Sequence, residues 1–109
     1  MELIRSSSES MIYVLWEFTV VPERRAAFEA AYKSDGVWAH LFRHDSAYRE
    51  TILIKEAEPG RYLTIDVWED REAYLRFKDR FADEYHKIDQ QCASLTQSER
   101  QIGIFEAIA

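Results

Sequence analysis

The sequence is poor in cysteine, glycine and proline, with one, three and two of them respectively. Cys92 has no second cysteine with which to form an intrachain disulfide, and a cysteine-based metal cluster is excluded. Glycine occurs only at positions 36, 60 and 103, and no G-x-G-x-x-G, P-loop, H-E-x-x-H or C-x-x-C motif is present. A phosphate cradle built from glycine-rich backbone, and with it a Rossmann-type flavin or nicotinamide site, is therefore set aside.

The sequence also lacks a long hydrophobic run and an excess of positive charge. No apolar stretch approaches the roughly 20 residues that span a bilayer, and the first residues lack the apolar segment of a signal peptide. Lys and Arg number 14 against 20 Asp and Glu, which gives a net charge of −6. Because phosphate backbones and anionic membranes attract positive charge, we expect a cytoplasmic protein without a nucleic-acid or membrane partner.

What remains is typical of one globular domain. The 109 residues are 47% hydrophobic and 31% charged, close to globular averages. Residues 1–10 read as a polar arm ahead of a single domain over residues 11–109. Aromatic residues make up 14%, which is high for this length, so they must line a core, an oligomer interface or a pocket.

Hydrophobic periodicity predicts a sequence of strands and helices. They are a strand over 11–21, a helical layer over 22–44 broken near Asp35 and Gly36, a strand over 48–56, a turn over 58–60, a strand over 61–69, a long helix over 71–95 capped by Asp70, a turn over 96–99 and a last strand over 100–108. The order β-α-β-β-α-β is that of the ferredoxin-like α+β fold, an antiparallel sheet with both helices on one face.

The first strand is apolar on both faces, with Trp16 and Phe18 on one and Tyr13 and Leu15 on the other. Such a strand is covered on both faces. The helices of this chain can cover only one of them, so the pattern predicts a homodimer.

Three histidines are the first candidates for chemistry. His40 and His44 are four residues apart, so on a continuous helix they would share a face and could chelate a metal. No carboxylate or cysteine completes an obvious ligand set, and we favour the view that His44 simply suits a helix end. His86 follows Tyr85 late in the long helix, either on the surface or facing the cleft between helix and sheet.

Two carboxylates lie in the middle of predicted strands, Glu17 in the first and Asp66 in the third. A carboxylate on a buried sheet face is costly unless it is paired or functional. We favour a salt bridge for each, with Arg24, Arg49 and Arg61 available, over a tuned acid or base in a pocket.

A set of aromatic residues could line an apolar cavity for a flat ligand. They are Tyr13, Trp16, Trp38, Phe42, Tyr48, Tyr62, Trp68 and Phe77. More than half of them should instead belong to a core or a dimer interface, because aromatic residues dominate both environments.

Several segments together resemble the antibiotic biosynthesis monooxygenase family of dimeric α+β barrels, over about residues 11–107. They are Asp35-Gly36-Val37-Trp38-Ala39-His40-Leu41-Phe42, the pair Tyr48 and Thr51, the run Arg61-Tyr62-Leu63-Thr64-Ile65-Asp66-Val67-Trp68-Glu69, and Leu95-Thr96-Gln97-Ser98-Glu99. The run on the third strand is the most specific of them, and the sequence is most similar to a little-characterised branch of the family.

The resemblance implies a homodimer whose two sheets pack face to face, and an activity. Characterised members are monooxygenases that use no cofactor and act on polyketide-type phenols, anthrones or quinols. The deprotonated substrate itself passes an electron to oxygen, so the protein supplies a dry aromatic pocket, a base and donors for the developing oxyanion.

On that basis we expect a monooxygenase acting on a small aromatic, phenolic or quinol compound, with no cofactor and no metal. The expected catalytic residues are Asp66 and His40, and the expected substrate-binding residues are Trp16, Trp38, Phe42, Tyr62, Trp68 and His86. The alternative is a non-catalytic dimeric protein that binds a small molecule or has a regulatory role. An enzyme should hold a cavity with a pKa-shifted group at its wall, whereas a bare binding or structural dimer should fill that space with side chains.

Haem degradation, which another branch of the superfamily performs, is disfavoured. That branch uses an Asn, a Trp and an axial His, and the matching positions here hold Phe18, Phe77 and Lys87. His86 is one residue away from the histidine position and would point elsewhere on a helix.

Overall fold

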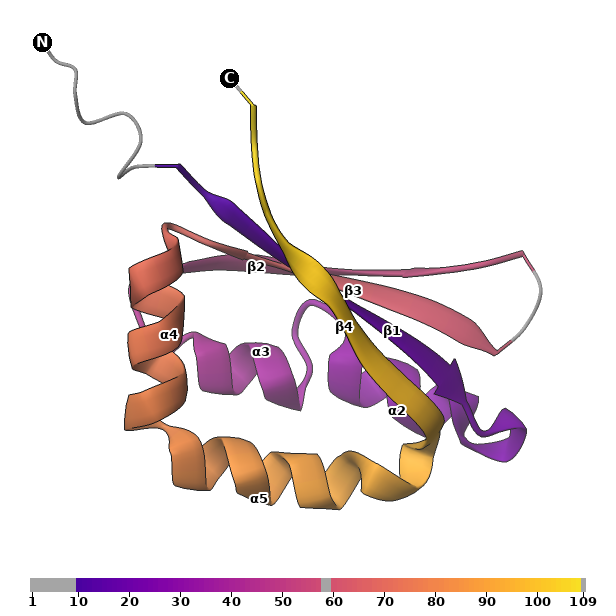
Figure 1. Cartoon of the computed structure of the whole chain (residues 1–109). Coiled ribbons are helices and arrows are strands. Elements are labelled where there is room, and N and C mark those ends of the chain that lie inside the picture. The colour runs from indigo at the N-terminus through magenta and orange to yellow at the C-terminus, as the bar shows by residue number, and fades with distance from the viewer. Residues whose placement is uncertain (1–9, 58–59, 109) are drawn as a thin grey trace, which may run out of the picture.

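The computed structural model describes residues 10–57 and 60–108, so most of the predicted polar arm and part of the turn over 58–60 lie outside the described residues. The elements, shown in Figure 1, are β1 (Ile12–Val20), η2 (Pro22–Arg24), α2 (Arg25–Tyr32), α3 (Val37–Phe42), β2 (Tyr48–Lys55), β3 (Arg61–Trp68), α4 (Arg71–Arg80), α5 (Ala82–Cys92), η3 (Ala93–Leu95) and β4 (Thr96–Glu106). The order βααββααβ confirms the predicted ferredoxin-like α+β fold.

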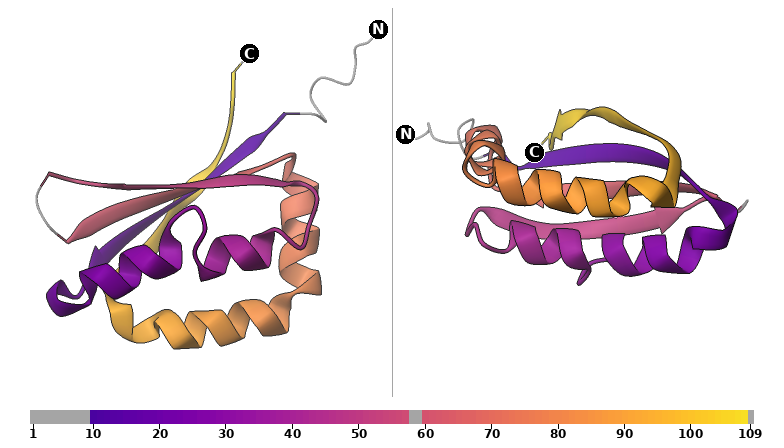
Figure 2. Two further views of the ribbon diagram at one scale, coloured as in Figure 1. Left: turned by 180° about the vertical axis from the view of Figure 1, so that it is seen from behind. Right: turned by 90° about the horizontal axis from the view of Figure 1, so that it is seen from below.

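The strands form one antiparallel sheet in the order β2-β3-β1-β4. Figure 2 shows the helices gathered on one face of this sheet, while the opposite face carries no helix. Side chains alternate accordingly along β1. Val14 and Phe18 are buried beneath the helices, whereas Leu15 and Glu17, on the uncovered face, are only half-buried.

Aromatic side chains build the core between the helices and the sheet. Phe28 and Tyr32, one turn apart on α2, stack with ring centroids 4.2 Å apart. Trp68 at the end of β3 packs against Phe77 of α4 at 5.0 Å. Phe28, Trp68 and Phe77 are fully buried, and each contributes about 2 kcal/mol or more of hydrophobic stabilisation.

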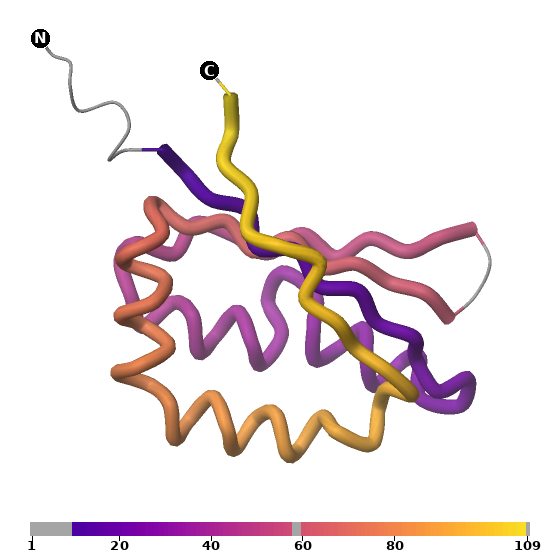
Figure 3. Tube along the Cα trace, viewed as in Figure 1, coloured from indigo at the N-terminus to yellow at the C-terminus, as the bar shows by residue number. Residues whose placement is uncertain are grey.

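The prediction of one long helix over 71–95 is wrong, because the chain turns a corner at Phe81. Figure 3 shows α4 and α5 running in different directions. Phe81 leaves helical geometry with φ −109° and ψ 29°, although its N–H still bonds Phe77 O at 2.9 Å. Both helices have apolar stripes of the same period, so periodicity alone cannot reveal the corner. Asp70, as predicted, caps α4 by accepting from the Ala73 N–H at 2.8 Å.

The predicted turn over 96–99 is also wrong, because β4 already begins at Thr96. In the ladder with β1, Thr96 pairs with Val20 and Glu99 with Phe18. The polar run that suggested a turn is the exposed beginning of an edge strand, where polar side chains face water. The strand ends at Glu106, two residues before the predicted end.

The predicted break near Asp35 and Gly36 is confirmed, and the glycine has a steric reason. A Cβ at Gly36 would lie 2.3 Å from Ala31 O and 2.6 Å from Ala30 O. The start of α3 therefore fits tightly against the end of α2. This contact fixes the position of Trp38, the second residue of α3.

Candidate functional site

A cavity lies between the helices and the helix-covered face of the sheet. Its empty space, open mouth included, is about 410 Å³. The residues that line it are Trp16, Phe18, Tyr32, Trp38, Phe42, Thr51, Thr64, Asp66, Tyr85, Asp89 and Glu99. Every strand and three of the helices contribute, so residues far apart in the sequence meet at one site.

Asp66 is the buried carboxylate of this cavity. It pairs with Thr51 of β2 on one side and Val14 of β1 on the other, and is only 8% exposed. The Thr51 hydroxyl donates to Asp66 Oδ1 at 2.7 Å, and Tyr48 Oη lies 2.8 Å from Thr51 Oγ1. Because threonine has one O–H and gives it to Asp66, Tyr48 is the donor to Thr51.

The surroundings of Asp66 tune its acidity. Burial raises the pKa of this carboxyl from 3.8 to about 7, and the hydrogen bond from Thr51 partly opposes the rise. A carboxyl group with a pKa near neutrality can both accept and return a proton at physiological pH. The chemistry available to the cavity is therefore general acid–base chemistry.

Tyrosine hydroxyls near Asp66 stay protonated. Burial, followed by the Asp66 charge, raises the pKa of Tyr74 to about 12, and burial is also the main cause of the raised pKa of Tyr85. Burial raises the pKa of Tyr32 in the same way. Tyr85 and Tyr32 line the cavity, so they bring neutral phenol side chains to it rather than phenolates.

Trp38 is the centre of the aromatic wall. Its ring centroid lies 4.9 Å from that of Tyr85 and 6.0 Å from those of Tyr32 and Phe42. Its indole Nε1 is buried and makes no hydrogen bond to a described residue. This part of the wall is thus aromatic, with packed rings from α2, α3 and α5.

The structure brings together four of the predicted site residues and separates the others. Asp66, Trp16, Trp38 and Phe42 line the cavity. Tyr62 and Trp68 share the parity of Asp66 on β3 but lie outside the lining. The Tyr62 hydroxyl donates to Glu29 at 2.5 Å, and Trp68 is completely buried in the core.

The histidines also lie outside the lining. His40 on α3 and His86 on α5 are exposed. His44 follows the end of α3, where its Nδ1 is 3.0 Å from Leu41 O, so His40 and His44 do not extend one continuous helix. Across residues 10–57 and 60–108, no three His, Cys, Asp or Glu side chains are grouped so as to hold a metal ion.

Sequence reasoning missed part of the cavity wall. Thr51, Thr64, Asp89 and Glu99 were not among the expected site residues, although they line the cavity. Thr64 shares the parity of Asp66, which was a usable signal. Glu99 fell in the predicted turn over 96–99, and no sequence signal distinguished Asp89 from the other polar residues of its helix.

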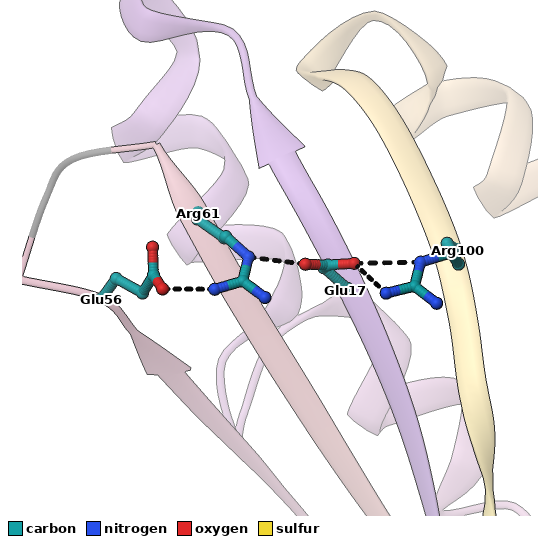
Figure 4. Close-up of polar contacts among 4 residues, drawn as sticks. All are labelled: Glu17, Glu56, Arg61 and Arg100. Atoms are coloured by element: carbon teal, nitrogen blue, oxygen red, sulfur yellow. Dashed lines mark hydrogen bonds and ion pairs between the residues drawn. The ribbon is translucent and has the colours of Figure 1, made fainter.

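Glu17 belongs to the other face of the sheet. Figure 4 shows it in a row with Arg61 of β3 and Arg100 of β4. Its carboxylate accepts from Arg61 Nε at 2.5 Å and from Arg100 Nη2 at 2.8 Å, and Arg61 also pairs with Glu56. The two guanidinium groups hold the pKa of Glu17 below its usual value. The salt-bridge interpretation is therefore right for Glu17, whereas Asp66 makes no ion pair with a described residue.

Among the described residues, no helix has the length and apolar character required to cross a membrane.

Solved structures share this fold. SnoaB, a cofactor-independent oxygenase from Streptomyces nogalater, is 20% identical with a TM-score of 0.66, over 92% of this chain and 95% of its own. A Bordetella bronchiseptica protein is 19% identical with a TM-score of 0.73, over 92% and 99%. Protein SO0527 from Shewanella oneidensis is 18% identical with a TM-score of 0.66, over 91% and 92%. At these identities the likeness shows the fold alone.

No curated protein matches the sequence. The family described as antibiotic biosynthesis monooxygenase matches residues 11–90, which is more than half of the chain. Together with the fold and its cavity, this match assigns the chain to the antibiotic biosynthesis monooxygenase family.

Proposed function

We propose that the protein is a monooxygenase that needs no cofactor and acts on a small phenolic or quinol compound, with Asp66 as its base. The observation that carries the proposal is the position of Asp66. It is a buried carboxylate with a pKa near 7 at the wall of an aromatic cavity. A general base works best when its pKa is close to the operating pH.

The chemistry can be written with oxygen as the only oxidant. Asp66 takes the hydroxyl proton, and the phenolate gives one electron to O2, which leaves a substrate radical and superoxide. These combine at a ring carbon to form a peroxide. Protonated Asp66 returns its proton to this peroxide. Where the ring carbon carries a hydrogen, loss of water from the hydroperoxide then leaves a carbonyl: one oxygen atom stays on the product and the other leaves as water. The hydroxyls of Thr64 and Tyr85 would donate to the developing charges.

Two observations support an enzyme over a bare binding or structural dimer. A pocket that opens to solvent lies between the helices and the sheet, and its wall carries a carboxyl group of raised pKa. In addition, SnoaB, which has the same fold, is a cofactor-independent oxygenase. Family membership is consistent with this chemistry and leaves the substrate open.

The test is oxygen uptake by chelator-treated protein with a panel of anthrones, naphthols and hydroquinones. We expect uptake by the wild type and a loss of about 100-fold or more in Asp66→Asn, which keeps the shape but cannot take the proton. His40→Ala distinguishes the two predicted bases. A loss of oxygen uptake in His40→Ala but not in Asp66→Asn would identify His40 as the base. No uptake with any compound by a folded protein would favour a non-catalytic binding protein.

We further propose that two copies associate through the uncovered face of the sheet. Ile52 and Ile54 of β2 are 39% and 44% exposed, and Phe105 of β4 is 48% exposed. By strand alternation and pairing they share that face with Leu63 and Ile65 of β3. Contiguous exposed apolar surface of this kind is typical of an interface. A stable monomer at micromolar concentration in sedimentation would contradict the proposal.

A further inference from the structure

The cavity has an acidic wall. Three of its lining residues are the carboxylates Asp66, Asp89 and Glu99, and none of the described residues that line it is Lys, Arg or His. None of the three forms an ion pair with another described residue. Among the described residues that line the cavity, none thus carries a positive charge that would compensate these carboxylates.

The three carboxylates lie at two depths. Asp66 is 8% exposed at the sheet, whereas Asp89 of α5 and Glu99 of β4 are exposed. Although Glu99 is exposed as a residue, partial burial of its carboxyl group, followed by the charge of Asp89, raises the pKa of Glu99. These two groups from separate elements therefore act on one another. Asp89 and Glu99 therefore form an acidic rim at the mouth, above a deeper and single carboxyl group.

Aromatic rings surround the space between rim and base. Trp16, Tyr32, Trp38 and Tyr85 all line it. Aromatic faces attract organic cations, whereas a metal ion would seek grouped oxygen or nitrogen ligands. The protein already uses one of these rings in this way, because Lys78 Nζ lies 5.0 Å from the Tyr85 ring centroid without lining the cavity.

We propose that the ligand of the cavity is a phenolic compound carrying a protonated amine, with the phenol toward Asp66 and the ammonium at the rim of Asp89 and Glu99. The inference rests on the proposed function in taking this cavity as the substrate site. It specifies a substrate class: the positive charge pairs with the rim and the aromatic faces, and the hydroxyl reaches the base. A phenol whose side chain carries a negative charge would be repelled by the carboxylates of the same rim.

Binding is tested without oxygen, so that turnover does not interfere. The probes are tyramine, 4-propylphenol and 3-(4-hydroxyphenyl)propionate, which share a phenol ring and a chain of similar length but are cationic, neutral and anionic at pH 7.5. Dissociation constants come from NMR shifts of the indole N–H signals of Trp16 and Trp38, with the core residue Trp68 as internal reference. We expect tyramine to bind about tenfold more tightly than 4-propylphenol, and the anion to bind most weakly.

Two variants locate the charge preference. Glu99→Gln and Asp89→Asn should each reduce the preference for tyramine roughly threefold, because each removes one charge of the rim. Glu23→Gln removes the same charge from an exposed glutamate of η2, outside the cavity, and should leave the preference unchanged.

Three results would overturn the inference: no binding of tyramine at millimolar concentration, equal binding of the three probes, or an unchanged preference in both rim variants. The oxygen-uptake test is separate. Selective binding of tyramine without uptake by any phenol would sustain the ligand class and contradict the proposed activity. Oxygen uptake with neutral phenols, together with no charge preference in binding, would support the proposed activity and contradict the ligand class.

Discussion

Thr51 and Asp66 face one another across the ladder between β2 and β3, and the threonine hydroxyl donates to the carboxylate at 2.7 Å. This is the hydrogen bond that stabilises the charged form of Asp66 against its burial. The pair therefore sets the proton affinity of the group on which the proposed chemistry depends.

Asp66→Asn should change how stability depends on pH. The pKa of Asp66 is raised from 3.8 to about 7 on folding, so the folded state holds a proton that the unfolded state has lost between these pH values. The stability contribution of the protonated form is complete below about pH 4 and is lost as the pH rises through about 7. The asparagine variant should lack this decline and be more stable at pH 8, by roughly 2–4 kcal/mol. Urea unfolding of both proteins from pH 4.5 to 8 measures this difference in the free energy of unfolding.

The control for this measurement is Asp79→Asn on the exposed face of α4, which should follow the wild-type curve. If the free energy of unfolding of Asp66→Asn falls with pH as steeply as that of the wild type, the raised pKa of Asp66 is contradicted.

Thr51→Val should raise the pKa of Asp66 further, because the hydrogen bond that lowers it is removed. It also leaves the Tyr48 hydroxyl without its acceptor, at a cost of roughly 1–3 kcal/mol. Carbon NMR titration of the aspartate carboxyl groups measures the shift. Thr51→Ser keeps the hydroxyl and should titrate like the wild type, and an unshifted Asp66 in the valine variant would refute the role of the bond.

Ile54→Glu should separate the two copies, because it places a charge within the apolar part of the uncovered face. Sedimentation velocity should show monomers where the wild type shows dimers. Leu75→Glu is the matched control, since Leu75 is 48% exposed but lies on α4, away from that face. Dissociation by the control alone would place the interface on the helices instead.

Gly36→Ala should destabilise the fold by roughly 3 kcal/mol, because its Cβ would lie 2.3 Å from a backbone oxygen that cannot move away. Gly103→Ala is the comparison. There the added Cβ meets the Phe105 ring at 3.1 Å, and a side chain can turn aside. Thermal unfolding of both variants should separate them clearly, and equal melting temperatures would contradict the tight contact between α2 and α3.

Much of the fold was accessible from the sequence because each strand and helix carries its own periodicity. The corner at Phe81 was not, since α4 and α5 both bury residues of one continuous stripe. What turns the chain there is tertiary: Phe77 packs on Trp68 at the sheet, while Tyr85 packs on Trp38 of α3.

The site was only partly accessible for a related reason. Asp66 stood out because a carboxylate in the middle of a strand is unusual, and Trp16, Trp38 and Phe42 were found as aromatic residues. Glu99 and Asp89 are ordinary polar residues in their own segments. They gain significance only because β4 and α5 meet at the mouth of the cavity, which no local pattern reveals.

The row of Glu56, Arg61, Glu17 and Arg100 has a consequence for association (Figure 4). Its two carboxylates and two guanidinium groups sum to zero, although the whole chain carries −6. The row thus neutralises itself before it meets another molecule. Two copies of the row would approach one another without net repulsion, so the contribution of the row to association should depend little on ionic strength.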